Sequence, residues 1–378
     1  MVNLFYFLKL IKIQLILYLF IIIMENINLN QRGKKMKVGI VGASGYSGLE
    51  LIRMLNMHPI IEELNFYALT SNANDISDIY PHLKSIMKGP IQKWVADQSI
   101  NENHIIFLAT PHGVSSEIVM NISDENVKII DLSGDFRLKE EQKYNKWYKS
   151  NHPCFSKTSN FTYGLAEWNK EEIKTSNFIA NPGCYPTASI LAIAPLLKEN
   201  LIVENSIIID AKSGISGAGK GSNEVTHFTN RNDNFTAYKI HDHQHIPEIE
   251  QFLSMINPKE NYITFTPHLV PMTRGIMATV YSTAREMISN EELQELYKEM
   301  YKDSYFIRIR DSIPCTKDVY GSNFCDIYPA FDERTNRITV ISVIDNLIKG
   351  AAGQAIQNMN IMLGLPEETG LTFTPIFP

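Results

Sequence analysis

One cysteine stands in a setting that favours nucleophilic chemistry. Cys184 lies in the segment 181–187, Asn-Pro-Gly-Cys-Tyr-Pro-Thr, directly before an apolar stretch, 188–197, that is predicted to be a helix. A thiol at a helix N-terminus is close to free backbone N–H groups and to the positive end of the helix dipole, which lower its pKa. We therefore predict that Cys184 is a nucleophile near neutral pH. The remaining cysteines are predicted to be small buried residues: Cys154, Cys315 and Cys325.

A nucleophilic thiol needs a base, and three of the ten histidines lie within five residues in the segment 241–248, His-Asp-His-Gln-His-Ile-Pro-Glu. One imidazole beside the thiol would act as general base and general acid. We predict that one of His241, His243 and His245 has this role, and the spacing does not decide among them. Glu248 is predicted to orient an imidazole or to bind a substrate amine. A zinc site would need a further ligand at helical or turn spacing, which the sequence does not show, so no metal is predicted.

Three segments carry groups suited to a small anionic substrate. The segment 212–220, Lys-Ser-Gly-Ile-Ser-Gly-Ala-Gly-Lys, follows a predicted strand and is rich in backbone N–H groups and hydroxyls. Arg274 ends another strand and could bind a carboxylate through two hydrogen bonds. Arg137 follows a strand at its carboxyl end, where ligands bind in open α/β sheets. The predicted substrate-binding residues are Arg137, Lys212, Ser213, Gly214, Glu248 and Arg274.

A glycine-rich loop joins the first predicted strand to the first predicted helix. The segment 42–48 reads Gly-Ala-Ser-Gly-Tyr-Ser-Gly, a spacing that lets the backbone approach a pyrophosphate held at the helix N-terminus. The second strand ends without the Asp or Glu that would bind the ribose hydroxyl of NAD, and Ser71 could donate to a 2′-phosphate. Asn72 stands where a positive charge would help, so these residues favour NADP without excluding NAD. The loop residues predicted to bind the cofactor are Gly42, Ser44, Gly45, Tyr46, Ser47 and Gly48.

The elements that would position these residues change in character along the chain. Strands expected at 37–41, 64–69, 105–109 and 127–132 alternate with helical stretches, which predicts a parallel, doubly wound sheet. After Cys184 we expect helices at 185–197 and 291–301 and strands at 206–211, 262–267, 277–282 and 338–344. This second block predicts an α+β domain with a mixed, largely antiparallel sheet. A final helix is expected over 345–363.

Composition excludes several classes of protein. The chain has 378 residues, 44% of them hydrophobic and 20% charged, and a net charge of −6, which excludes a mainly disordered chain and argues against a nucleic-acid binder. Residues 1–35 contain an apolar run broken by Lys9 and Lys12, which is either a signal-anchor or, as we favour, an upstream start codon added before Met36. Without that segment the surface is that of a cytoplasmic enzyme.

Together these segments resemble the N-acetyl-gamma-glutamyl-phosphate reductase family, over Met36 to about Leu365. The resemblance lies in eight separate motifs in the right order: GASGYSG (42–48), ATPHGVS (109–115), DLSGDFRL (131–138), NPGCYPTA (181–188), SGISGAGK (213–220), HQHIPEI (243–249), FTPHLVPMTRG (265–275) and DNLIKGAAGQAIQNMN (345–360). Gln244 stands where this family usually has arginine.

The resemblance implies the aspartate-semialdehyde dehydrogenase and glyceraldehyde-phosphate dehydrogenase fold, with NADPH as cofactor. It implies reduction of N-acetyl-glutamyl 5-phosphate to the 5-semialdehyde through a thioester on Cys184, with release of phosphate, in arginine biosynthesis. Aspartyl phosphate or a carrier-linked amino-adipyl phosphate is the alternative substrate. It further implies that His243 or His245 is the acid/base residue, and that Thr110, Pro111 and Asn346 contact the cofactor.

The expected domain organisation has four parts. They are an N-terminal extension (1–35), an NADP-binding Rossmann domain (36–183), a catalytic and dimerisation domain (184–344), and a C-terminal helix that returns to the Rossmann domain (345–378). The extensive sheet of the second domain predicts a homo-oligomer, either a dimer or a tetramer.

Overall fold

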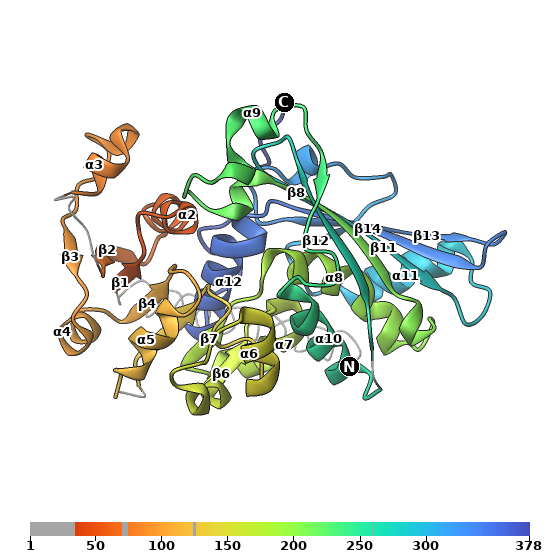
Figure 1. Cartoon of the computed structure of the whole chain (residues 1–378), viewed down its shortest axis with the longest axis horizontal. Helices are drawn as coiled ribbons and strands as arrows, with labels where there is room; N and C mark the ends of the chain where they lie inside the picture. Colours follow the sequence, from red (N-terminus) through yellow and green to blue (C-terminus); the bar gives the residue numbers. More distant parts are fainter. Residues whose placement is uncertain (1–34, 70–74, 124–125, 260) are drawn as a thin grey trace, which may run out of the picture.

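The computed structural model describes residues 35–69, 75–123, 126–259 and 261–378. The apolar N-terminal run, Ser71 and Asn72 lie outside the described residues. Two seven-stranded sheets lie side by side, one on each side of the C-terminal helix (Figure 1). Among the described residues, no helix has the length and apolar character needed to cross a membrane.

The first sheet is entirely parallel, with strand order β3-β2-β1-β4-β5-β7-β6. Its central strands are short apolar runs whose side chains are buried on both faces, as expected where helices cover a parallel sheet. The strands are β1 (Met36–Val41), β2 (Ile61–Ala68), β3 (Ile91–Lys93), β4 (Ile105–Leu108), β5 (Lys128–Asp131), β6 (Phe161–Tyr163) and β7 (Phe178–Ala180). The helices are α2 (Tyr46–Leu55), α3 (Ile76–Ile79), α4 (Ala96–Asn101), α5 (Val114–Met120), α6 (Glu141–Tyr148) and α7 (Ala166–Thr175).

The second sheet is mixed, with strand order β12-β13-β14-β11-β8-β10-β9. All neighbouring pairs are antiparallel except β8 with β10 and β12 with β13. The strands are β8 (Ile208–Gly214), β9 (Thr236–Ala237), β10 (Thr264–Val270), β11 (Ile276–Thr283), β12 (Ile307–Ile309), β13 (Cys325–Asp332) and β14 (Arg337–Ile344). The helices are α8 (Cys184–Lys198), α9 (Phe228–Arg231), α10 (His245–Ile256) and α11 (Asn290–Met300).

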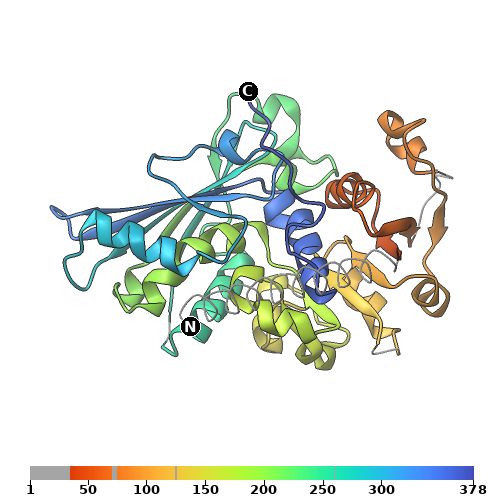
Figure 2. The same ribbon diagram turned by 180° about the vertical axis from the view of Figure 1, so that it is seen from behind.

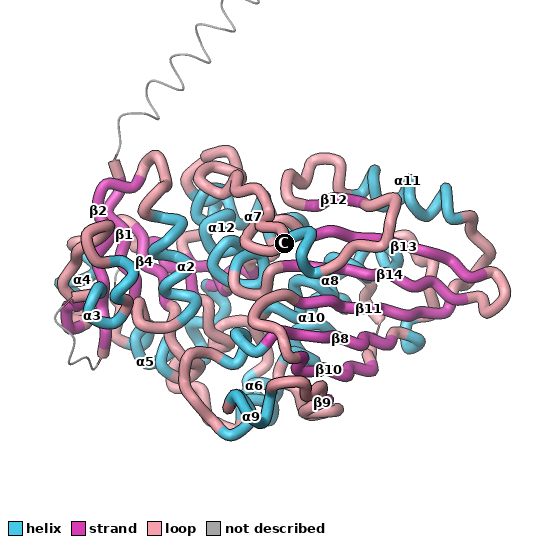
Figure 3. The backbone as a smooth tube through the Cα atoms, turned by 90° about the horizontal axis from the view of Figure 1, so that it is seen from above, coloured by secondary structure: helices cyan, strands magenta, loops and turns pink. Residues whose placement is uncertain are grey.

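Helix α8 begins at Cys184 and is held in place by the core of the second domain. Every residue between its two ends is buried, because the helix packs on the second sheet on one side and against α10 on the other. In Figures 1 and 3 the described helices α8, α10 and α11 all lie on the same face of this sheet. The N-terminus of α8 is therefore fixed by a large apolar core.

The C-terminal segment is not the single helix predicted for 345–363. A π-helical turn, Ile348–Ala352, comes first, and α12 (Gly353–Met362) follows it. Asp345 accepts hydrogen bonds from the N–H groups of Leu347 and Ile348 and so starts the turn. Helix α12 then packs against α7 and α2 of the first domain (Figure 2). The predicted fold class, including the returning helix, is confirmed.

Several elements were missed in the sequence. Strand β13 contains Pro329, which disrupts the expected pattern; the proline is tolerated because β12 pairs only with Cys325–Ile327 and leaves that part of β13 with one neighbour. Strands β6 and β7 have only three residues each. Helix α10 begins inside the histidine segment, where Pro247 occupies the first turn and needs no N–H partner.

Candidate active site

A cavity of about 960 Å³ lies between the two sheets. It is lined by the glycine loop, the turn after β4, the start of α8, the loop after β8, the histidine segment and the π-helical turn. These segments come from both domains and are far apart in sequence. The fold therefore gathers most of the chemistry-bearing motifs around one space.

The glycine loop shows why two of its glycines are needed. Gly42 has a φ of +88°, and a Cβ there would lie 2.4 Å from the carbonyl oxygen of Ala109. A Cβ on Gly48 would lie 2.4 Å from the carbonyl oxygen of Gly42. Tyr80 fixes the loop from outside, since its hydroxyl donates to the carbonyl oxygens of Ser44 (2.8 Å) and Gly45 (3.1 Å).

This loop presents the N-terminus of α2 to the cavity. No side chain caps the first turn of α2 in the described structure, which leaves backbone N–H groups for an anion. Gly48 packs behind the loop and does not line the cavity, and Ser71 lies outside the described residues. The predicted cofactor-binding residues that line the cavity are Gly42, Ser44, Gly45, Tyr46, Ser47, Thr110, Pro111 and Asn346.

Cys184 is the first residue of α8 and lines the cavity. Its thiol does not have the lowered pKa that its position predicts: burial raises the pKa of Cys184 to about 11. The Arg137 guanidinium and the backbone amides at the helix start act in the opposite direction, but they do not offset the loss of solvent. In the ligand-free protein the sulfur therefore keeps its proton at neutral pH.

The two histidines of the segment lie close together, with ring centroids 4.7 Å apart. His245 faces the turn before Cys184, because a Cβ on Gly183 would lie 2.5 Å from His245 Nε2. Its Nδ1 has no hydrogen-bond partner among the described residues. His243 is occupied: its Nδ1 accepts the backbone N–H of His245 (3.2 Å) and its Nε2 lies 3.4 Å from the Tyr238 hydroxyl.

Both imidazoles are neutral at physiological pH. Burial lowers the pKa of His243 to about 3 and that of His245 well below its usual value, and the charges of Lys239 and Arg137 act in the same direction. A neutral imidazole can accept a proton from the thiol during attack. The geometry therefore favours His245 as the acid/base residue and leaves His243 to hold the start of α10.

Glu248 does not have the predicted contact with an imidazole or substrate. Its carboxylate is 1% exposed and lies outside the cavity lining. It accepts hydrogen bonds from Tyr163 Oη (2.8 Å) and from the N–H of Gly183 (2.8 Å), and it pairs with Arg137 Nη1 at 3.2 Å. Its role is to hold the turn before Cys184 and the arginine beside it.

Arg137 does line the cavity, as predicted for a substrate-binding residue. Its Nε and Nη2 donate to the carbonyl oxygens of Asn181 and Leu132, both at 2.8 Å. A Cβ on Gly183 would lie 2.9 Å from Arg137 Nη1, so a buried positive charge lies beside the nucleophile's turn.

Lys212, Ser213 and Gly214, at the end of β8, were predicted to bind substrate, but only one of them lines the cavity. Ser213 lines the cavity, whereas Lys212 points to the opposite face of β8 and pairs with Asp210 Oδ2 at 2.7 Å, because successive side chains of a strand alternate. Gly214 is also outside the lining; a Cβ there would lie 2.8 Å from the backbone N of Arg274. Of the three residues, only Ser213 therefore lines the cavity.

Arg274 is also placed differently from the prediction. Its guanidinium pairs with Glu50 of α2, and its Nη1 lies 3.6 Å from Asp345 Oδ2. Arg274 does not line the cavity. It joins the second domain to the helix that follows the glycine loop.

Several cavity residues were not predicted from the sequence, among them Tyr238, Lys239 and Gly350. Tyr238 reaches the site from an irregular loop, for which the pattern gives no signal. Lys239 donates to Gln244 Oε1 at 3.0 Å and brings a positive charge to the position where the family usually has arginine. Gly350 packs directly against Cys184, where only glycine fits, because a Cβ at Gly350 would lie 2.8 Å from Cys184 Cβ. Of the other cysteines, Cys154 and Cys325 are buried as predicted, but Cys315 is exposed.

Comparison with known proteins adds independent evidence. The semialdehyde dehydrogenase NAD binding domain family matches residues 37–176, and the semialdehyde dehydrogenase dimerisation domain family matches residues 184–346. Curated proteins named N-acetyl-gamma-glutamyl-phosphate reductase from Geobacillus sp. (strain WCH70) and Bacillus subtilis (strain 168) are each 51% identical over 345 residues, which cover 91% of this chain and 100% of each relative.

Solved structures show the same fold. Aspartate semialdehyde dehydrogenase II from Vibrio cholerae, complexed with ASA, has a TM-score of 0.67 at 18% identity and covers 88% of this chain and 99% of its own. Aspartate semialdehyde dehydrogenase with NADP from Candida albicans has a TM-score of 0.62 at 15% identity, with coverage of 87% and 99%.

Proposed function

The chain belongs to the N-acetyl-gamma-glutamyl-phosphate reductase family, and from this premise we propose that it reduces N-acetyl-L-glutamyl 5-phosphate to N-acetyl-L-glutamate 5-semialdehyde with NADPH and releases phosphate. The reaction is a step of arginine biosynthesis. One observation carries the proposal: Cys184, His245 and Arg137 line the same cavity as the glycine loop, and His245 and Arg137 both lie beside Gly183.

The residues of the glycine loop fit a dinucleotide. A Cβ on Gly42 or Gly48 would collide with backbone, so the close turn that brings N–H groups to a pyrophosphate depends on glycine. Bound there, NADPH supplies the hydride that reduces the acyl group. Ser44, Tyr46, Ser47 and Thr110 offer hydroxyl and backbone donors to it, with Pro111 and Asn346 alongside.

Cys184 would attack the acyl carbon, forming a C–S bond while the C–O bond to phosphate breaks. Because the thiol is protonated in the ligand-free protein, its proton must leave during attack, and the neutral imidazole of His245 would accept it. The resulting thioester accepts hydride more readily than a carboxylate. His245 then returns the proton when the tetrahedral adduct collapses to the aldehyde and the sulfur leaves.

Arg137 and the loop after β8 would bind the anionic parts of the substrate. Arg137 places a buried positive charge beside Cys184, where negative charge develops during attack. Ser213 and Ser216 line the cavity on the other side, and the amide of Asn346 links them to the turn before β11 through Ser216 Oγ at 3.0 Å and the N–H of Gly275 at 2.8 Å.

The test is phosphate-dependent oxidation of N-acetyl-L-glutamate 5-semialdehyde, followed by absorbance of the reduced nicotinamide, with NADP and NAD compared directly. The same assay is run with aspartate semialdehyde and with the carrier-linked amino-adipate semialdehyde. Turnover of the acetylated glutamyl substrate, faster with NADP, is expected. Preference for either of the other two aldehydes would overturn the substrate assignment.

We also propose that the protein is a cytoplasmic homo-oligomer that pairs through the second sheet. The matching family is described as a dimerisation domain, and the described helices leave one face of that sheet open (Figure 3). Half-buried side chains on this face are Met277, Thr279, Tyr281, Tyr328 and Ile341. Light scattering measures the mass in solution, and cell fractionation with N-terminal sequencing tests the location and the status of residues 1–35.

A further inference from the structure

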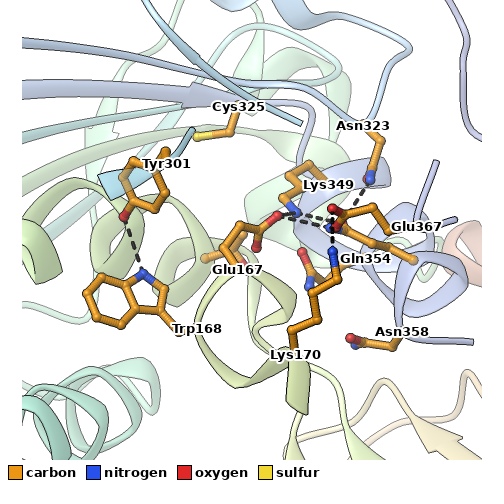
Figure 4. Close-up of polar contacts among 12 residues, drawn as sticks. Glu167, Trp168, Lys170, Tyr301, Asn323, Cys325, Lys349, Gln354, Asn358 and Glu367 are labelled. Atoms are coloured by element: carbon orange, nitrogen blue, oxygen red, sulfur yellow. Dashed lines mark hydrogen bonds and ion pairs between the residues drawn. The ribbon is translucent and has the colours of Figure 1, made fainter. Parts of the chain in front are cut away.

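A buried ion pair lies behind the active site, on the side away from the cavity. Lys349 Nζ lies 2.5 Å from Glu167 Oε1 and 2.7 Å from Gln357 Oε1, and the side chains of Lys349 and Glu167 are both 0% exposed. Gln357 also donates to Glu167 Oε1 (3.0 Å) and Glu367 Oε2 (2.7 Å). Figure 4 shows Lys349 and Glu167 pointing toward one another, with Lys170 and Glu367 beside them.

Stability is a weak reason for such a pair. Removing two charges from water costs free energy that their attraction repays only partly, and apolar side chains of similar volume often serve a fold equally well. The apolar core around this network is already extensive, since α12 is buried along its whole length. The position of the pair therefore matters more than its strength.

Lys349 lies in the π-helical turn Ile348–Ala352, and this turn contacts the nucleophile. The next residue, Gly350, would place a Cβ 2.8 Å from Cys184 Cβ and 3.2 Å from Cys184 Cα. The carbonyl oxygen of Ala351 accepts a hydrogen bond from Asn181 Nδ2 at 3.1 Å, three residues before Cys184. Turns of this kind are frequent at functional sites, where they place one part of the backbone differently from an α-helix.

A second set of contacts connects α12, the helix that follows the π-helical turn, to the turn before Cys184. Asn358 Nδ2 donates to Asn181 Oδ1 (3.1 Å) and to the carbonyl oxygen of Gly164 (2.8 Å). Asn181 in turn offers its carbonyl oxygen to Arg137 Nε. Movement of the π-helical turn would therefore displace both Cys184 and the arginine beside it.

We propose that Lys349 is a positioning residue that, through its ion pair with Glu167, holds the π-helical turn against Cys184 and so sets the position of the attacking sulfur. The inference rests on the proposed function only through the role of Cys184 as nucleophile. Lys349 touches neither the cavity nor the thiol itself, so its effect passes through the Gly350 backbone.

The test compares the double variant Lys349→Met/Glu167→Gln, which removes both charges at similar volume, with the parent and with Lys170→Met. Lys170 is the matched control: its Nζ pairs with Glu367 at 3.0 Å in the same network but lies outside the π-helical turn. The readouts are kcat, the KM for NADPH, and the rate of iodoacetamide alkylation of Cys184, measured on its own peptide by mass spectrometry because Cys315 is exposed.

We expect the double variant to lose about tenfold in kcat and in the alkylation rate of Cys184, with the KM for NADPH unchanged and Lys170→Met at parent values. Unchanged alkylation and kcat in the folded double variant would overturn the proposal. Should the double variant not fold, Glu167→Gln alone decides, with a smaller loss of alkylation expected and an unchanged rate contradicting it. Alkylation is measured without substrate, so failure of the proposed reaction would not affect this result.

Discussion

At the scale of single residues, the proposed chemistry depends on the protonation states of Cys184 and His245. Cys184 is a protonated thiol and His245 a neutral imidazole because the same burial disfavours charge on both. The helix N-terminus singled out Cys184 as the nucleophile candidate, and Cys184 does begin α8 and line the cavity. The sequence did not indicate its protonation state, because the extent of desolvation depends on segments far away in sequence.

The raised pKa of Cys184 predicts a distinct pH dependence of its alkylation. In the ligand-free protein the rate should keep rising above pH 9 toward a midpoint near 11, since only the thiolate reacts. The denatured chain is the control, in which the same thiol should titrate near its ordinary value of 9.0. A midpoint below 9 in the folded protein would mean that the helix amides and Arg137 outweigh burial.

Substitutions of His243 and His245 should lower kcat to different extents. His245→Asn removes the imidazole that faces the nucleophile's turn and is expected to lower kcat by about 10²-fold or more. His243→Asn keeps an acceptor for the N–H of His245 and should lower kcat by about tenfold at most. The reverse order in steady-state measurements of kcat would assign the acid/base role to His243.

At the scale of elements, the strand–loop–helix unit at the start of the first domain could be predicted from the sequence, because a side chain at Gly42 or Gly48 would collide with the backbone. Strand β8 was also predicted, but the directions of its side chains were not. Alternation along the strand points Ser213 into the cavity and Lys212 to the open face of the sheet. The contacts of Glu248 with Gly183 and of Arg274 with Glu50 could not be predicted, because these partners lie far away in the sequence.

The glycine loop gives a stability test with a matched control. Gly48→Ala should lower the free energy of unfolding by about 2 kcal/mol, because the new Cβ meets backbone atoms that cannot move aside. Gly45→Ala should cost less than about 1 kcal/mol, since its Cβ would meet only the Gly42 carbonyl oxygen at 3.6 Å. Urea unfolding of both variants measures the difference, and equal losses would refute the steric argument.

At the scale of the whole molecule, the candidate active site lies between two domains that are joined by the C-terminal helix and by hydrogen bonds and ion pairs across their boundary, such as Arg137 with Glu248. Arg274 is one such link, through Glu50 and Asp345. The two-domain architecture could be predicted from the change in strand and helix pattern after Cys184. The π-helical turn could not, because nothing in an apolar helical pattern distinguishes it from an ordinary helix.

Arg274→Gln distinguishes a link between domains from a substrate contact. It leaves the buried Glu50 with only Arg53 as a charged partner among the described residues, so we expect a loss of about 2 kcal/mol in the free energy of unfolding. The KM for the acyl phosphate should change by no more than about twofold. A large rise in that KM with unchanged stability would restore the predicted carboxylate clamp.

The central claim is that Cys184 carries the acyl group during the reaction. Mixing the enzyme with N-acetyl-L-glutamyl 5-phosphate in the absence of NADPH should release one phosphate per active site in a burst and add one N-acetylglutamyl group to the Cys184 peptide, as detected by mass spectrometry. Cys184→Ser should show neither signal, whereas Cys315→Ser should show both. Turnover by Cys184→Ser, or an acyl group found on another residue, would contradict the account.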